Sequence, residues 1–191
     1  LVAEELWARL HIRLDQARFL RERSDRDSLS GLLLRRPFLE ALDRYLAAAQ
    51  RDHGALSLAL IDIDRFKKIN NEHGHLAGDA VIARFGQLLR QRFRFEDLRC
   101  RWGGEEFMVA FSGQTGDFAE IAVKRLLDEF ASLDFEIATG GSLRATFTAG
   151  VAHHPHDGPS AEALIRCADD RLYEGKKAGR NRVVRWSERL T

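Results

Sequence analysis

Large apolar residues recur at every second position on both sides of Gly103-Gly104, and this pattern constrains the local fold more than any other in the 191-residue chain. They are Leu98, Cys100 and Trp102 before the glycines, and Phe107, Val109 and Phe111 after them. A period of two that is interrupted by a glycine pair predicts a β-hairpin with a tight turn. Glycine suits the tip because both central residues are expected to need a positive φ.

Two acidic residues, Glu105 and Glu106, directly follow these glycines. A hairpin turn does not require adjacent carboxylates, which repel each other unless a cation lies between them. The glycines leave the backbone open to close approach by a ligand. The tip therefore predicts a site for a divalent metal and phosphate.

Another acid lies near the end of an apolar strand. The run Leu58–Asp64 reads Leu-Ala-Leu-Ile-Asp-Ile-Asp, which would present Asp62 at the edge of a sheet, where ligands commonly bind. A buried structural acid is the alternative, but such acids are uncommon and need a partner. We favour a pocket in which Asp62 joins Glu105 or Glu106 to hold Mg²⁺, because Mg²⁺ uses one or two carboxylates together with substrate phosphates. This set is typical of the two-metal sites of nucleotidyl-transfer enzymes.

The composition is that of one soluble globular domain with some extra length. Apolar residues make up 45% and charged residues 31% of the chain. A net charge of +1 argues against a general nucleic-acid binder, which would have a strong basic excess. No apolar run approaches the roughly 20 residues that cross a bilayer, and no signal peptide is visible. We expect a cytoplasmic protein with reduced Cys100 and Cys167 and, since the chain begins at Leu1 and its only methionine is Met108, a fragment of a longer protein.

Residues 1–24 are expected to form one amphipathic helix. Its apolar residues recur at steps of three and four: Ala3, Trp7, Leu10, Leu14 and Ala17. The pattern fits a coiled-coil stalk and equally a helix that lies on its own domain, because about two heptads are fewer than a firm coiled coil needs. The predicted boundaries are 1–24 for this stalk helix and 25–191 for the globular domain.

Strands and helices alternate after residue 25, which predicts a single α/β domain. Besides the hairpin, we expect helices over Pro37–Gln50, Phe66–His73, Asp79–Phe93, Phe118–Phe130 and Ala161–Lys177. We expect strands over Leu56–Ile63, Leu143–Ala152 and Arg182–Trp186. A surface loop is a better assignment than a transition-metal site for the cluster of His153, His154 and His156.

Several segments of the chain resemble one family. Gly103–Phe107 reads Gly-Gly-Glu-Glu-Phe, which is similar to the signature of the GGDEF family, the bacterial diguanylate cyclases. Residues 62–79 match the family's pattern Asp-x-Asp-x-Phe-Lys-x-x-Asn…Gly-His-x-x-Gly-Asp at every one of its positions. Residues 168–182 are similar to its closing segment, with Arg171 and Gly175 in place of alanines. Residues 27–38 resemble its opening segment, with Ser30 for threonine and Leu34 for an asparagine, which removes a local cap.

This resemblance implies a central, mostly antiparallel sheet flanked by helices, as in nucleotidyl cyclases and the palm of polymerases. It implies an enzyme that condenses two GTP molecules to cyclic di-GMP and two pyrophosphates. It also implies two Mg²⁺ ions per site, or Mn²⁺ in their place, held by Asp62, the Ile63 carbonyl, Glu105 and Glu106. The three acids are the catalytic candidates as well, and which hairpin glutamate is base and which is ligand stays open.

For the nucleotide, the resemblance assigns the guanine edge to Asn70 and Asp79 and places His75 beside the substrate. The chemistry is consistent, because guanine N1–H and its 2-amino group are donors that a carboxylate can accept, and adenine lacks that pair. Asp79 thus favours GTP. The remaining candidates for substrate binding are Phe66, Lys67, Gly103, Gly104, Lys176 and Arg180, of which the cations would hold the triphosphate.

Arg94 and Asp97 form an Arg-x-x-Asp motif that ends six residues before Gly103. Such a pair is common on solvated surfaces and is weak on its own. Its spacing to the hairpin matches the family's inhibitory product site. The resemblance therefore implies that cyclic di-GMP binds at Arg94 and Asp97 and restrains the enzyme.

The product joins two nucleotides, so the resemblance implies a homodimer in which each 3′-hydroxyl faces the other α-phosphate. The first helix would hold two domains at high effective concentration, and a regulatory protein or a preceding sensory segment would act on it. A GTP or cyclic di-GMP receptor is one alternative, opposed by Asp62 and the hairpin acids. A cyclase with another nucleotide choice is opposed by Asp79. We expect no nucleic-acid partner and no membrane contact for this part of the protein.

Overall fold

The computed structural model describes residues 25–136 and 140–185. Its main sheet has the strand order β2-β3-β1-β6-β7. The strands are β1 (Leu56–Ile63), β2 (Leu98–Arg101), β3 (Glu106–Ser112), β6 (Phe147–His154) and β7 (Arg182–Val184). Neighbours are antiparallel except for β7, which runs parallel to β6. The prediction of an α/β domain with a mostly antiparallel sheet is confirmed.

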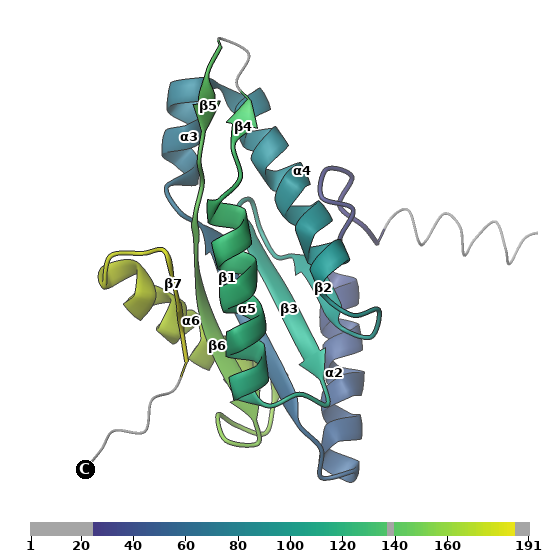
Figure 1. Cartoon of the computed structure of the whole chain (residues 1–191). Coiled ribbons are helices and arrows are strands. Elements are labelled where there is room, and N and C mark those ends of the chain that lie inside the picture. Colours follow the sequence, from purple (N-terminus) through teal and green to yellow (C-terminus); the bar gives the residue numbers. More distant parts are fainter. Residues whose placement is uncertain (1–24, 137–139, 186–191) are drawn as a thin grey trace, which may run out of the picture.

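Helices cover both faces of this sheet (Figure 1). On one face lie α2 (Arg35–Arg51) and α6 (Ala161–Lys177), and on the other lie α4 (His75–Arg92) and α5 (Gly116–Ala131). The short α3 (Phe66–His73) follows β1 and packs on α4. Each helix has an apolar stripe facing the sheet, which is how an amphipathic helix buries its surface.

The central strand β1 divides the core in two. Its side chains alternate between the faces, so that Ile61 joins the core under α4 and α5 while Leu60 joins the core under α2 and α6. Phe85 of α4 anchors the first core, with its ring centroid 4.7 to 5.3 Å from those of Phe107, Phe130 and Phe147. By the same alternation, Asp62 belongs to the face of α2 and α6.

A glycine in β6 sets how closely α6 approaches the sheet. A Cβ atom at Gly150 would lie 2.0 Å from the Ala168 carbonyl oxygen and 2.5 Å from the Leu172 backbone nitrogen. Any larger residue would push α6 away. The close contact fixes the course of the helix, whose last turn then carries Lys176 to the end of β1.

Most predicted elements are present. The bounds of β1, α3 and α6 are those expected, and the other helices differ by a few residues at their ends. The helix expected to begin at Asp79 begins at His75, because Gly74 with φ of 83° already separates it from α3.

One predicted strand was wrong. The segment 143–152 is divided into β5 (Ser142–Leu143) and β6, and β5 pairs with β4 (Phe135–Glu136) in a separate two-stranded ribbon. The break could not be predicted from the sequence, because Leu143 at the end of β5 and Ala145 within the break are buried like residues of the main sheet.

The helix predicted for residues 1–24 and the end of the last predicted strand at Trp186 lie outside the described residues. The choice between a coiled coil and a helix on its own domain therefore stays a prediction, as do the domain boundaries. Within residues 25–136 and 140–185, no helix combines the length and apolar character that a membrane span requires.

Candidate active site

The hairpin between β2 and β3 forms as predicted, but its glycines serve a different purpose. Neither Gly103 nor Gly104 has a positive φ, so that expectation was wrong. A Cβ at Gly103 would lie 2.9 Å from Glu106 Oε2, whereas a Cβ at Gly104 would meet no heavy atom within 4 Å. Gly103 therefore makes room for the Glu106 carboxylate, and Gly104 leaves the tip open to solvent.

Asp62 and Glu106 are direct partners across the β1–β3 ladder. Because paired residues in an antiparallel ladder project from the same face, both side chains lie on the side of α2 and α6. Lys176 completes the group, with its Nζ 2.8 Å from Asp62 Oδ2. Glu105 directly precedes Glu106 in the turn, and its carbonyl oxygen accepts a hydrogen bond from the Ile63 backbone nitrogen at 3.2 Å. The structure thus brings Asp62, Ile63, Glu105 and Glu106 to one edge of the sheet.

Opposing electrostatic effects act on the Asp62 carboxylate in this group. Burial raises the pKa of Asp62, Lys176 opposes that rise, and the negative charges of Glu105 and Glu106 add to it. Among the described residues, no three His, Cys, Asp or Glu side chains are grouped so that they could hold a metal ion. The donor set nevertheless suits Mg²⁺, which takes few carboxylates and completes its shell with phosphates and water.

An arginine that sequence reasoning missed holds the hairpin tip. Arg101 donates to the Gly104 carbonyl from Nε at 3.0 Å and from Nη2 at 2.8 Å. Its Nη1 donates to both carboxylate oxygens of Asp27, at 3.1 and 3.0 Å. Burial raises the pKa of Asp27, but hydrogen bonds from Ser30 and the charge of Arg101 outweigh it and leave that pKa below its usual value. The segment before α2 is thereby tied to the turn that carries the acids.

A second cluster lies between α3 and α4. Asn70 Oδ1 is buried, and among the described residues no hydrogen-bond partner reaches it. It faces the helix backbone at Gly78, where a Cβ would lie 1.9 Å from this oxygen and 3.0 Å from Phe66 Cζ. An unsatisfied buried acceptor costs free energy, which makes the Asn70 oxygen a candidate for ligand binding. Asp79, the next residue of α4, is exposed beside it.

The remaining substrate candidates surround these two clusters. Lys67 on α3 and His75 at the start of α4 are both exposed, and neither forms an ion pair within the described residues. Arg180 lies in the loop after α6 with φ of 65°, an uncommon value for a residue other than glycine.

Asp64, which was assigned no role from the sequence, is a structural acid. It is 7% exposed and accepts hydrogen bonds from the Thr146 and Thr148 hydroxyls, both at 2.6 Å, and from the Asn181 backbone nitrogen at 3.0 Å. These bonds fix the loop that carries Arg180. Of the two aspartates near the end of β1, Asp64 therefore has a purely structural role, whereas Asp62 does not.

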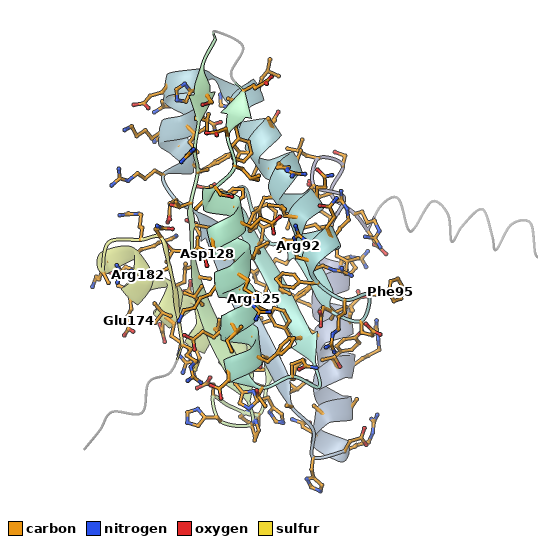
Figure 2. The ribbon with its side chains drawn as sticks, viewed as in Figure 1. Arg92, Phe95, Arg125, Asp128, Glu174 and Arg182 are labelled. Carbon is orange, nitrogen blue, oxygen red and sulfur yellow. The ribbon has the colours of Figure 1, made fainter. Side chains whose placement is uncertain are left out.

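Arg94 and Asp97 occupy a tight turn between α4 and β2. The Arg94 backbone nitrogen donates to Asp97 Oδ2 at 2.9 Å, and Asp97 is almost fully buried, which raises the pKa of its carboxyl group. The Arg94 guanidinium lies 5.6 Å from the centre of the Phe118 ring. Both motif residues line a cavity of about 290 Å³ together with Phe118, Ile121 and Arg125 of α5. Figure 2 shows Arg125 on the exposed side of that helix and Phe95 projecting from the turn into solvent.

The comparisons with known proteins decide the family. The model of the family described as "Diguanylate cyclase, GGDEF domain" matches residues 24–182. The chain belongs to the GGDEF domain family. Diguanylate cyclase DgcP of Pseudomonas aeruginosa is 37% identical over 85% of this chain, and response regulator PleD of Caulobacter vibrioides is 35% identical over 95% of it. The chain spans 24% and 42% of the length of these two relatives.

Solved GGDEF structures share the fold. The coiled coil and GGDEF domain of DgcB from Caulobacter crescentus, solved in complex with c-di-GMP, superimposes with a TM-score of 0.88 at 26% identity over 95% of this chain and 96% of that one. Diguanylate cyclase SiaD of Pseudomonas aeruginosa, in complex with its activator SiaC, superimposes with a TM-score of 0.83 at 30% identity over 97% of this chain and 70% of that one.

Two departures from the GGDEF pattern in α6 have physical reasons. Arg171 forms a two-pronged ion pair with Asp157, at 2.6 Å for each contact, and donates to the Val151 carbonyl at 2.6 Å. A Cβ at Gly175 would lie 2.7 Å from Thr148 Cγ2 and 3.1 Å from Val184 Cγ2, so an alanine would crowd these side chains. Neither residue touches the candidate site.

The two departures before α2 differ in effect. Ser30 is buried and its hydroxyl accepts from the Leu32 backbone nitrogen at 3.4 Å, so it keeps a local contact. Leu34 occupies the N-cap position of α2 and provides no side-chain cap, as predicted.

The histidine cluster is only partly in a loop. His153 and His154 are the last residues of β6, and His154 is buried, so the surface-loop assignment holds for His156 alone. His153 Nδ1 lies 3.1 Å from Ser57 Oγ, and His156 Nδ1 lies 2.9 Å from Asp157 Oδ1. His154 Nδ1 lies 3.0 Å from the Gly158 carbonyl oxygen, so each of the three rings has a separate partner.

Proposed function

We propose that this chain is the GGDEF domain of a diguanylate cyclase that condenses two GTP molecules to cyclic di-GMP and two pyrophosphates. The observation that carries the proposal is the pairing of Asp62 with Glu106 across β1 and β3, beside the open Gly104 tip and under Lys176. Carboxylates and a cation at the edge of a sheet suit the transfer of a nucleotidyl group.

Two Mg²⁺ ions, or Mn²⁺ in their place, would be held by Asp62, the Ile63 carbonyl, Glu105 and Glu106. Diguanylate cyclases of this family generally depend on divalent metals. Such ions, when bound, neutralise charge on the triphosphate and on the leaving pyrophosphate. The raised pKa of Asp62 fits this role, because three acids at one edge favour the arrival of positive charge.

In each condensation the 3′-hydroxyl oxygen of one GTP forms a bond to the α-phosphorus of the other. The bond from that phosphorus to the bridging oxygen breaks, pyrophosphate leaves, and the hydroxyl proton is removed. Glu105 lies in the turn beside Glu106 and is our choice for accepting that proton. Glu106, which faces Asp62, is then the better candidate for a ligand.

We assign guanine to the space between α3 and α4. Asn70 Oδ1 lacks a donor among the described residues, and guanine offers two. Asp79 would accept from the same edge, Phe66 would pack beside the base, and His75 would lie near the nucleotide. The triphosphate would run past Gly103 and Gly104 toward Lys67, Lys176 and Arg180, whose charges complement it.

Turnover would require a homodimer, because one domain holds one GTP. The stalk helix predicted for residues 1–24 would keep two domains close, and a regulatory protein or a preceding sensory segment would act on it. The proposal of a regulatory protein is supported by SiaD, a diguanylate cyclase that was solved in complex with its activator SiaC. We place the domain in the cytoplasm, where free thiols such as those of Cys100 and Cys167 persist.

Cyclic di-GMP would inhibit by binding at Arg94 and Asp97. The cavity of about 290 Å³ at this turn supports the proposal, and Arg92 of α4 and Arg125 of α5 line it together with Arg94. Because Asp97 is buried and bonded to its own turn, Arg94 and Arg125 would make most of the contact with phosphate.

Incubation with GTP and Mg²⁺, followed by chromatographic separation of the products, tests the function. We expect cyclic di-GMP and pyrophosphate from dimeric protein, loss of both in Glu105→Ala, and weaker product inhibition in Arg94→Ala. Asn70→Ala should reduce the preference for GTP over ATP. Dimeric protein that binds GTP or cyclic di-GMP yet forms no product would establish the alternative, a receptor domain that regulates a partner.

A further inference from the structure

A groove separates α2 from α6 on their face of the sheet. The helices meet at one end, where Gln50 Nε2 donates to the Pro159 carbonyl at 2.6 Å, and they enclose a cavity of about 480 Å³. The apolar residues of its lining include Leu39, Leu60, Trp102 and Ile165. Leu60 is buried, and the other three are only partly buried. Because Glu106 also lines the groove, this apolar surface adjoins the candidate active site.

Carboxylates outnumber cations in the groove. Its charged lining residues are Glu106, Glu162, Asp169, Arg35 and Arg166. The Arg35 guanidinium lies over one wall, 4.0 Å from the centre of the Trp102 ring. An apolar groove with an acidic rim suits a protein segment that presents an apolar side chain beside positive charge.

The first turn of α4 is such a segment. Leu76 is 81% exposed and belongs to neither core of the domain. It lies three residues before Asp79, so both side chains project from the same side of the helix at the proposed guanine site. Cations outnumber carboxylates at this corner between α3 and α4. Its charged residues, from position 65 to position 79, are Arg65, Lys67, Lys68, Glu72 and Asp79.

The proposed reaction fixes how two domains must face each other. Each 3′-hydroxyl attacks the α-phosphorus of the other nucleotide, so a two-fold axis relates the two nucleotides and they run in opposite directions. Guanine is assigned to the space between α3 and α4, and the phosphates are assigned to the region of Lys176. The guanine end of one nucleotide therefore lies opposite the phosphate end of the other. This arrangement directs the first turn of α4 in one copy toward α6 of the other, and the same contact occurs twice.

We propose that Leu76 packs into the groove between α2 and α6 of a second copy of this chain while the two GTP molecules condense. The orientation of the copies rests on the proposed function. The contact rests on the exposure of Leu76, on the apolar groove and on the opposite charges around them. Since Glu106 lines the groove, each contact would hold the nucleotide of one copy against the active-site edge of the other. Each site would thus be incomplete without Leu76 of the second copy.

A charge exchange tests the contact. Leu76→Asp places a carboxylate against the acidic groove, and Ile165→Lys places an ammonium group opposite the basic corner, on a side chain long enough to reach solvent. Each should lower turnover at least about tenfold, because the burial of an apolar side chain is lost. The double variant should recover most of this loss, since the new carboxylate then meets the new ammonium group. An equimolar mixture of the two single variants should recover part of it. Lys124→Asp, at an exposed position of α5 on the opposite face of the sheet, is the control for an added acid.

Cross-linking detects the contact without relying on turnover. Leu76→Cys protein is mixed with Ile165→Cys protein, a non-hydrolysable GTP analogue and a short bismaleimide, and covalent dimers are resolved by denaturing electrophoresis. We expect a dimer from this mixture, and none from Leu76→Cys alone or mixed with Lys124→Cys. The wild type controls for the partly buried thiol of Cys167. Calorimetry should show that the cysteine variants bind the analogue as tightly as the wild type does, and a thermal melt checks that every variant folds.

The outcomes separate the contact from the proposed function. Wild-type turnover in Leu76→Asp, no recovery in the double variant, or no cross-link would each overturn the contact while cyclase activity of the wild type stays intact. Weaker binding of the analogue by Leu76→Cys would also overturn it, because Leu76 would then pack against the guanine of its own domain. If the cross-link forms but the wild type makes no cyclic di-GMP, the contact stands and the proposed function is contradicted.

Discussion

Lys176 Nζ lies 2.8 Å from Asp62 Oδ2, so the last turn of α6 places a cation on the carboxylate near the end of β1. Burial nevertheless raises the pKa of Asp62, and Glu105 and Glu106 contribute to the rise. The folded protein therefore disfavours the ionised form. Burial therefore destabilises the ionised carboxylate of Asp62, and the ion pair with Lys176 partly offsets this effect. Such a carboxylate is better suited to binding a ligand than to stabilising the fold.

Replacing Asp62 with asparagine should separate stability from activity. Because a raised carboxyl pKa lowers the free energy of unfolding as pH rises above the usual value of 3.8, the wild type should lose stability in that range and Asp62→Asn should not. We expect the variant to melt at or above the wild-type temperature at pH 7, with turnover reduced at least about 100-fold. Asp170→Asn, an exposed position on α6, is the control. A clear fall in melting temperature would make Asp62 a structural acid.

Arg101 should couple the segment before α2 to the hairpin. It binds Asp27 and the Gly104 carbonyl at once, which a lysine cannot reproduce because its ammonium lacks the planar set of donors. We expect Arg101→Lys and Asp27→Asn each to lower turnover, and the double variant to lose less than the sum of both effects. Steady-state kinetics of the four proteins give this coupling energy. If the losses of turnover in the two single variants add up in the double variant, the ion pair between Arg101 and Asp27 does not influence the hairpin tip.

The sequence predicted the parts of the site that depend on local pattern. A continuous apolar run located β1, alternating apolar residues located the hairpin, and together these elements bring Asp62 and Glu106 into register. The sequence did not predict the residues that support the site. Arg101 and Asp27 are 74 residues apart, and a single charged residue does not indicate which distant residue it will pair with. The same holds for Asp64, whose threonine partners lie on β6 or just before it.

The role of the hairpin glycines also needed the structure. The sequence pattern predicted a positive φ at Gly103, whereas the structure shows that Gly103 leaves space for Glu106 Oε2. The break between β5 and β6 was missed because burial continues across it. Local periodicity thus locates the elements, and contacts between them determine how the site is supported.

Gly78→Ala tests the nucleotide pocket. The added Cβ would lie 1.9 Å from Asn70 Oδ1, so the Asn70 side chain must rotate away from its present position. Alanine is favoured over glycine within a helix by about 1 kcal/mol, which offsets the crowding. We expect a melting temperature within a few degrees of the wild type, because a change of about 1 kcal/mol shifts the melting temperature of a domain of this size by about 2 to 4 °C. We expect a KM for GTP raised about tenfold by loss of one hydrogen bond. An unchanged KM would remove Asn70 from the guanine site.

Leu34→Asn should stabilise the domain. Leu34 has the extended backbone of an N-cap residue, with φ of −77° and ψ of 163°, and it is partly exposed to solvent. An asparagine side chain can accept from the backbone nitrogen of Arg36, since Pro37 at the third helical position has no N–H, and such a cap typically adds about 1 kcal/mol. Urea unfolding measures the gain. Leu34→Ala controls for loss of the leucine and should show none.

The ion pair between Asp157 and Arg171 should make stability depend on acid. Burial raises the pKa of Asp157, but hydrogen bonds from Arg171, His156 and the His153 backbone outweigh it and lower that pKa from 3.8 to about 2. A lowered carboxyl pKa contributes stability that is complete above pH 4 and is lost as pH falls toward 2.

Asp157→Asn should therefore unfold with less urea at pH 6, by a free energy on the order of 2 kcal/mol, since one pKa unit corresponds to about 1.4 kcal/mol. The difference in free energy of unfolding between Asp157→Asn and the wild type should become smaller as the pH falls below 4. Asp134→Asn, at an exposed ion pair with Arg144, should show a far smaller difference at any pH. If the difference in free energy of unfolding between wild type and Asp157→Asn stays constant from pH 6 to pH 3, then Asp157 acts through shape and hydrogen bonding rather than through its charge.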